Sequence, residues 1–258
     1  MGDIARRLEA QGDEPARRRA RDLIADWLER APDWHPVAWA PQVVGQRVAN
    51  WLTHAAFLAR GRTDELGPRI LASLTRQATH LGRTLGSGAE GVSRLLAIKG
   101  LLYASLCGVG GARRAAKALR RLRRELGRQV LPDGGHVTRA PSLHLRALAA
   151  LVDIRAMLLM ADRQVPVEID AAIERMAPMV HYFRHGDGAL ALFNGGVEEE
   201  PAFIDAVLER AAINELPPES PPDLAFQRLA AGQLLVLVDA GPPPPKGFDG
   251  QAHAGVLS

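Results

Sequence analysis

The sequence predicts a mostly α-helical protein that passes into β-structure near its C-terminal end. Apolar residues recur at spacings of three and four through most of the chain up to residue 214, which is the period of an amphipathic helix. Beyond residue 214 the chain becomes proline-rich and then shows short apolar runs typical of strands. Aromatic residues make up 5% of the sequence, and alanine, leucine and arginine are abundant, which favours helix over sheet.

Three helices are expected in the first third of the chain. Residues 14–31 and 41–60 carry apolar stripes of helical period, and Pro32 and Gly61 mark where these two helices stop. A third helix is expected after Thr63, which is followed by two acids and therefore looks like an N-cap.

The middle of the chain alternates between apolar and charged helices. Residues 91–107 are apolar almost all round, so this helix is expected in an inner layer, with Cys107 as a small buried hydrophobe. Residues 111–130 carry a thin leucine stripe on a basic helix, as an outer helix would. Further helices are expected at 141–162, 168–183 and 201–212. This alternation with short turns predicts antiparallel helical hairpins, stacked as a solenoid or curled into a toroid.

A second domain is expected to begin after residue 214. Residues 215–222 read as a linker, and the apolar runs 225–230 and 233–238 flank Ala231-Gly232 as a hairpin would. Residues 256–258 look like the start of another strand. Because so few strands make a marginal unit, residues 215–258 are expected to be the beginning of an incomplete β-domain, and the chain a fragment of a longer protein.

Composition excludes several classes of function. The net charge is +3 and one cysteine is present, so no internal disulfide can form. No signal peptide or membrane span is evident, which predicts a cytoplasmic location for the sequence as written. There is no P-loop, no dinucleotide-binding glycine motif and no serine-hydrolase motif, so nucleotide-dependent and serine-hydrolase chemistry lose support.

Two polar clusters are candidates for chemistry. The turn at 131–136 leaves His136 at the mouth between two helices, although turn chemistry alone favours an ordinary helix–helix turn with Asp133 as its cap. His181 and His185 are spaced to share one helical face and could hold a divalent metal. No third ligand supports that, so a polar helix end reaching a substrate cleft is the preferred interpretation.

The helix at 111–130 allows a nucleic-acid interpretation, since clustered arginine neutralises phosphates. It carries the basic residues Arg113, Arg114, Lys117, Arg120, Arg121, Arg123, Arg124 and Arg128. Its leucine stripe and its lack of aromatic residues favour an ordinary solvated face, so no nucleic-acid partner is predicted.

Several segments taken together resemble the heparinase II/III-like family of polysaccharide lyases. They are Gln129–His136 followed by Arg139, Pro141 and His144; Met176–Met179; Phe183–Gly188; Leu190–Gly195; Arg47–Trp51; Phe226–Leu229; Val238–Gly241; and Ala252–Ala254. The resemblance implies an incomplete (α/α) toroid over residues 1–214, followed by the first strands of a truncated β-sandwich domain in residues 215–258.

The resemblance also implies a reaction. Such lyases cleave bonds to uronic acids by β-elimination, which needs a group that neutralises the uronate carboxylate, a base and an acid. Family members use Asn or His for the first role and Tyr and His for proton transfer. This sequence departs from the pattern, since Leu143 stands where many members have tyrosine before the second histidine. An expected Asn-His pair is absent at 88–91, and His253 alone remains of a His-x-His-x-Asp motif.

Site residues and partners are therefore predicted as follows. The catalytic candidates are His136, His144, Tyr182, His185 and His253. The candidates for substrate binding are Arg47, Asn50, Arg139, Arg184, Asp187 and Asn194. The predicted partner is an acidic polysaccharide, and no cofactor is predicted, although a zinc site could lie in the β-domain beyond residue 258.

Three functions stay open at this level. The first is a lyase, and the family resemblance would allow it to work in the periplasm or cell envelope. The second is a non-catalytic carbohydrate-binding or envelope-assembly module on the same scaffold. The third, a basic scaffold for protein or nucleic acid, rests on the arginine-rich helix alone.

Overall fold

The computed structural model describes residues 8–30, 34–59, 65–86, 89–109, 111–217, 219–232 and 234–248. The chain divides into two compact units. One comprises residues 1–89 and 93–121, and the other residues 90–92 and 122–258. The predicted domain boundary after residue 214 is a different division and stays a prediction.

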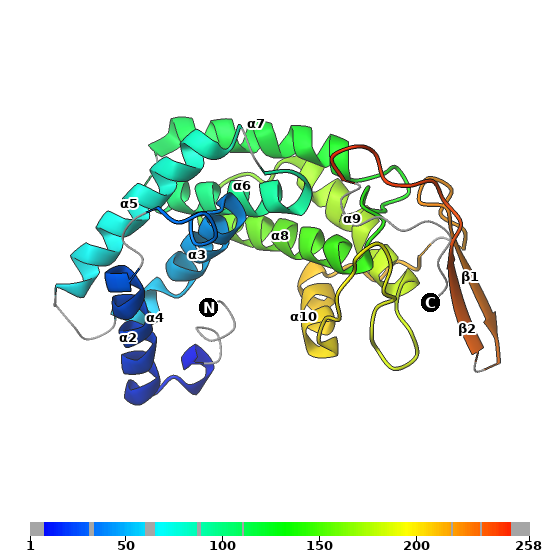
Figure 1. Cartoon of the computed structure of the whole chain (residues 1–258), viewed down its shortest axis with the longest axis horizontal. Helices are drawn as coiled ribbons and strands as arrows, with labels where there is room; N and C mark the ends of the chain where they lie inside the picture. Colours follow the sequence, from blue (N-terminus) through cyan, green and yellow to red (C-terminus); the bar gives the residue numbers. More distant parts are fainter. Residues whose placement is uncertain are drawn as a thin grey trace. The chain divides into compact units, whose positions relative to one another are not determined.

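The first unit is built from helices that the sequence pattern anticipates. They are α2 (Glu14–Arg30), α3 (Pro41–Thr53), α4 (Ala55–Ala59), α5 (Leu66–Thr84) and most of α6 (Gly91–Leu106), together with the first part of α7 (Gly111–Gln129). Helix α5 packs against α2 and α3 (Figure 1). The predicted Thr63 cap lies outside the described residues.

Two predictions differ from the structure in this unit. The single helix expected at 41–60 is broken at His54, which leaves helical geometry while its ring lies 2.5 Å from Glu9. Cys107 is exposed rather than buried, because α6 ends at Leu106, one residue before it. The rest of α6 is buried almost throughout, as its apolar sequence predicts.

A close helix crossing holds α3 against α6. A Cβ built on Gly45 would lie 2.2 Å from the carbonyl oxygen of Leu96, and one on Gly100 would lie 2.4 Å from the Cα of Gly45. Only glycine fits at such a backbone contact. These two glycines therefore set the distance between the helices.

The described residues of the second unit include the last part of α7, the helices α8, α9 and α10, and a β-hairpin. Helices α8 (Pro141–Met160) and α9 (Val167–Tyr182) pack as a helical hairpin, and α10 (Pro201–Ala211) lies against both (Figure 1). Strands β1 (Phe226–Ala231) and β2 (Leu234–Asp239) pair in antiparallel register from Phe226 opposite Asp239 to Ala231 opposite Leu234. The predicted hairpin is thus confirmed.

Burial along the hairpin is uneven. Phe226, Leu237 and Asp239 are buried, whereas Leu229 and Leu234 are exposed. The hairpin is therefore anchored at its open end, near the start of β1 and the end of β2. None of the helices in the described ranges is long and apolar enough to cross a membrane.

Candidate functional site

The turn between α7 and α8 is fixed by its own backbone and by α9. The amide of Leu131 donates to Gly135 at 2.8 Å, and the Asp133 carboxylate accepts the amide of Gly135 at 3.0 Å. Gly134 has φ +89°, and a Cβ there would lie 2.0 Å from the carbonyl oxygen of Arg175 on α9. The turn thus lies directly on the α9 backbone, which requires glycine at this position.

His136 points into the protein rather than into solvent. Its side chain is 1% exposed, with Nδ1 at 2.7 Å from the Thr138 hydroxyl and Nε2 at 3.2 Å from the Gln129 side-chain oxygen. Gln129 in turn donates to the buried carboxylate of Glu125 at 2.8 Å. Both ring nitrogens are therefore used in a buried polar chain that begins on α7.

His144 is buried on α8. Its Nε2 donates to the carbonyl of Met176 at 2.9 Å, and its Nδ1 has no hydrogen-bond partner among the described residues. Burial lowers the pKa of His144 to about 4 and that of His136 to about 3, where the charge of the neighbouring His144 adds to the effect. Both imidazoles are neutral at physiological pH.

These two histidines are expected to make the fold sensitive to acid. Unfolded, each would bind a proton near its ordinary pKa of 6.5, but in the folded chain only near 3 for His136 and 4 for His144. The unfolded state then holds more protons, so stability is fully present above pH 6.5 and is lost as the pH falls toward 4. The expected slope is up to about 1.4 kcal/mol per pH unit for each histidine.

Denaturant unfolding measured at about pH 7.5 and about pH 5 checks this expectation. His144→Gln should flatten the pH dependence, whereas His181→Gln, which changes an exposed histidine at the end of α9, should leave it as in the parent chain. Equal stability of the parent chain at the two pH values would contradict the expectation.

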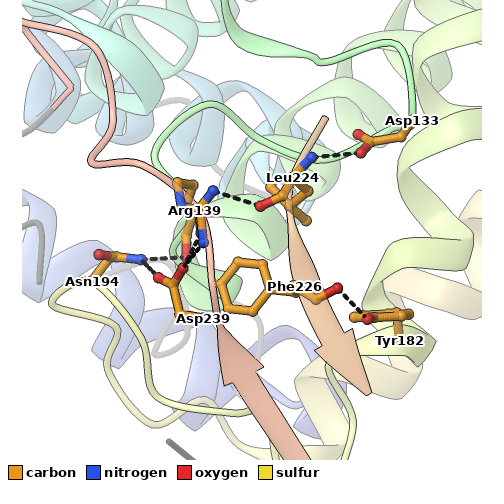
Figure 2. Close-up of polar contacts among 8 residues, drawn as sticks. Asp133, Arg139, Tyr182, Asn194, Leu224, Phe226 and Asp239 are labelled. Atoms are coloured by element: carbon orange, nitrogen blue, oxygen red, sulfur yellow. Dashed lines mark hydrogen bonds and ion pairs between the residues drawn. The ribbon is translucent and has the colours of Figure 1, made fainter. Parts of the chain in front are cut away.

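Arg139 and Asn194 hold the end of β2. The Arg139 side chain is 5% exposed, forms an ion pair with the buried carboxylate of Asp239 and donates to the carbonyl of Leu224 at 2.5 Å. Asn194 donates from Nδ2 to the other Asp239 oxygen at 2.9 Å and to the Arg139 carbonyl at 3.0 Å. Figure 2 shows both side chains converging on Asp239. Both side chains are buried, and the carboxylate that Arg139 meets is the chain's own.

Asp133 and Tyr182 hold the start of β1. The second oxygen of Asp133 accepts the Leu224 amide at 2.7 Å, and the Tyr182 hydroxyl donates to the Phe226 carbonyl at 3.0 Å (Figure 2). The Phe226 ring lies between Phe183, Phe193 and the Arg139 guanidinium, at 4.9 to 5.1 Å. Burial raises the pKa of Tyr182, so its hydroxyl stays protonated and donates.

The remaining candidates of this unit lie in the loop after α9. Arg184 donates to the Gly188 carbonyl at 3.0 Å and pairs with Asp205 at 2.8 Å, while Asp187 accepts the Ala189 amide at 2.9 Å. His185 is half-buried. Because α9 ends at Tyr182, His181 and His185 do not share a helical face, which removes the geometric basis for a metal pair.

Two candidates belong to the first unit. Arg47 is buried on α3, where its guanidinium lies 4.1 Å from the centre of the Trp27 ring and donates to Gln77 at 2.8 Å and to the Ala38 carbonyl at 2.9 Å. In the described part of the chain its Nη2 is buried without a hydrogen-bond partner, and burial lowers the pKa of Arg47 to about 10. Asn50 on the same helix is half-buried.

The last catalytic candidate, His253, lies outside the described residues. Within the described ranges, no three His, Cys, Asp or Glu side chains gather as a metal-ligand set. Sequence reasoning did not single out Gln129, Thr138 or Asp239 as site residues. For Asp239 the sequence offers one signal of a structural role, which is an acidic residue at the end of an apolar strand.

Comparison with known proteins gives consistent results. Residues 1–219 match the family model of the heparinase II/III N-terminus. Over 237 residues the chain is 32% identical to FtsZ-localized protein C of Caulobacter vibrioides, a match that covers 92% of this chain and 41% of that protein.

Solved structures share the fold. Heparinase III matches with a TM-score of 0.72 at 14% identity, over 92% of this chain and 43% of that one. Heparan sulfate lyase HepC from Pedobacter heparinus matches with a TM-score of 0.62 at 17% identity, over 98% and 45%. The predicted fold class, helical hairpins of the (α/α)-toroid kind followed by strands, is confirmed. The chain spans less than half the length of these relatives.

Proposed function

This chain belongs to the heparinase II/III family, and from that premise we propose that it is a non-catalytic member that binds an acidic polysaccharide of the bacterial envelope near the division site. The polysaccharide is the ligand class that the family suggests. The division site is suggested by the name of the relative from Caulobacter, FtsZ-localized protein C.

One observation supports the absence of catalysis most directly. The groups that resemble the proton-transfer residues of a lyase, His136, His144 and Tyr182, are each about 1% exposed. A general acid or base must come within hydrogen-bond reach of the substrate proton. Here the His136 ring is bonded inside the protein and the Tyr182 hydroxyl is committed to β1, so each acts on the fold instead.

β-Elimination is the second candidate, because heparinase III and the lyase HepC share the fold. For that reaction His185 is the candidate to test, since it is half-buried in a loop rather than sealed in the core. His253 would be the other.

The experiment incubates the full-length protein with heparan sulfate and with polygalacturonate, and follows two readouts. The first is the ultraviolet absorbance of an unsaturated uronate product, with an active heparinase as positive control. The second is retention of the polysaccharide on immobilised protein.

We expect retention without product. Product formation that is lost in His185→Ala would establish the lyase instead. Absence of both product and retention would overturn the proposed ligand.

A further inference from the structure

Helix α7 carries its charge in an unusual arrangement. Arg113, Lys117, Arg120 and Arg124 follow one another at spacings of four, three and four residues, so their side chains lie in one line along the helix. At 1.5 Å rise per residue the line is roughly 16 Å long. All four side chains are exposed, on the face opposite to the buried Leu122. We call these four residues the basic stripe.

Three cations beside the basic stripe are already engaged by the protein. Arg121 donates to the carbonyl of Leu85, Arg123 pairs with Glu168 at 3.1 Å, and Arg128 pairs with Glu125 at 3.3 Å. For the four residues of the basic stripe, in contrast, the described part of the chain supplies no carboxylate partner. The stripe is therefore a row of uncompensated charge, in which like charges at i, i+4 oppose helix formation.

Small residues border the stripe on α7, while the centre of the Phe248 ring lies 5.9 Å from the Arg128 guanidinium near the C-terminal end of the helix. Ala116 and Gly127 are exposed on its border, and α7 contains no aromatic residue. From Arg113 to Arg124 the helix therefore presents a row of exposed cations with small residues at its border. Single-stranded nucleic acid is disfavoured, because its binding sites combine cations with aromatic platforms for the bases.

We propose that the basic stripe of α7 binds an acidic polysaccharide along the helix. Arginine makes up three of its four positions, and the planar guanidinium matches carboxylate and sulfate groups with two parallel hydrogen bonds. The inference rests on the proposed function for its ligand class. It places the ligand on the exposed face of α7, whereas Glu125 and Gln129, which lead to His136, are buried on the same helix.

The test compares three forms of the full chain for binding to heparin and to polygalacturonate at several salt concentrations. The first is the parent chain. The second carries Arg113→Ala, Lys117→Ala, Arg120→Ala and Arg124→Ala. The third is a control with the same loss of charge at four exposed arginines on separate elements, namely Arg18→Ala, Arg76→Ala, Arg163→Ala and Arg175→Ala. Circular dichroism checks that all three fold, as expected because every substituted side chain is exposed.

We expect the stripe variant to lose at least about tenfold in affinity, and its dependence of log K on log salt to flatten by about three. The control should change affinity by less than about threefold, because its charges are scattered. If the parent chain binds and the stripe variant binds as well as the control, the stripe is not the site, while the proposed function survives.

Two other outcomes would overturn the proposal. If the parent chain binds neither polysaccharide, the proposed function fails and this inference fails with it. Bound heparin is also competed with duplex DNA and with free heparin, at equal concentrations of negative charge. If DNA is the stronger competitor, the partner is nucleic acid and the polysaccharide assignment is overturned.

Discussion

Arg139→Ala is expected to lower the free energy of unfolding by about 3–5 kcal/mol, the loss typical of breaking a buried ion pair from one side. The substitution leaves the 2% exposed side chain of Asp239 charged and without its cation. It also removes the hydrogen bond to the Leu224 carbonyl. Alanine keeps the Cβ, so the positive φ of 57° at this position is strained to the same degree in both forms, and the change reports the lost contacts.

Denaturant unfolding measures the loss, and limited proteolysis shows whether the β1–β2 hairpin is released. Arg146→Ala is the matched control, because it breaks an ion pair with Glu199 in which the arginine side chain is 46% exposed. Such a surface pair is worth up to about 1 kcal/mol. The interpretation of Arg139 as the anchor of the hairpin is wrong if the two variants unfold at the same denaturant concentration.

Gly134→Ala is expected to destabilise the fold by about 2–5 kcal/mol. A left-handed backbone costs a residue with a Cβ about 1–2 kcal/mol, and the new methyl group would overlap the carbonyl of Arg175, which adds about 1–3 kcal/mol of overpacking. Because the contact is backbone, it is relieved only if the turn moves away from α9. That movement would also displace Asp133 from the Leu224 amide.

Thermal unfolding of Gly134→Ala and Gly127→Ala separates this effect from a general effect of added methyl groups. Gly127 lies on α7 with nothing within 4 Å of an added Cβ, so Gly127→Ala should stabilise the helix by about 0.5–1 kcal/mol. A Gly134→Ala protein with an unchanged midpoint would show that the turn does not lie tightly on α9.

Helix periodicity carried most of the fold prediction. Helices α6, α7, α8, α9 and α10 lie within one or two residues of the predicted ranges, because an apolar stripe and its flanking glycines and prolines are local signals. The break at His54 was missed because no glycine or proline marks it, and its ring lies against Glu9, far away in sequence. The exposure of Cys107 was missed because a helix end can shift by one residue without a change in pattern.

The candidate site was less accessible to sequence reasoning. The position of His136 after a Gly-Gly turn predicts a polar side chain at the mouth between two helices. No local sequence signal indicates that Gln129 and Thr138 bind its two ring nitrogens. The same holds for Tyr182, whose hydroxyl meets a carbonyl of a strand 44 positions further along the chain.

The sequence by itself determined the order of the helices, the final hairpin and the family, since these depend on spacings and motifs within short segments. Only the tertiary structure decided what the motif residues touch. Arg139 and Asp239 are 100 positions apart, and Asn194 joins them from a third segment. Hydrophobic periodicity fixes which face of an element is buried, but a polar side chain that is buried takes its partners from whatever the packed elements bring beside it. That is why residues that the sequence predicts for a lyase site are found here holding a β-hairpin in place.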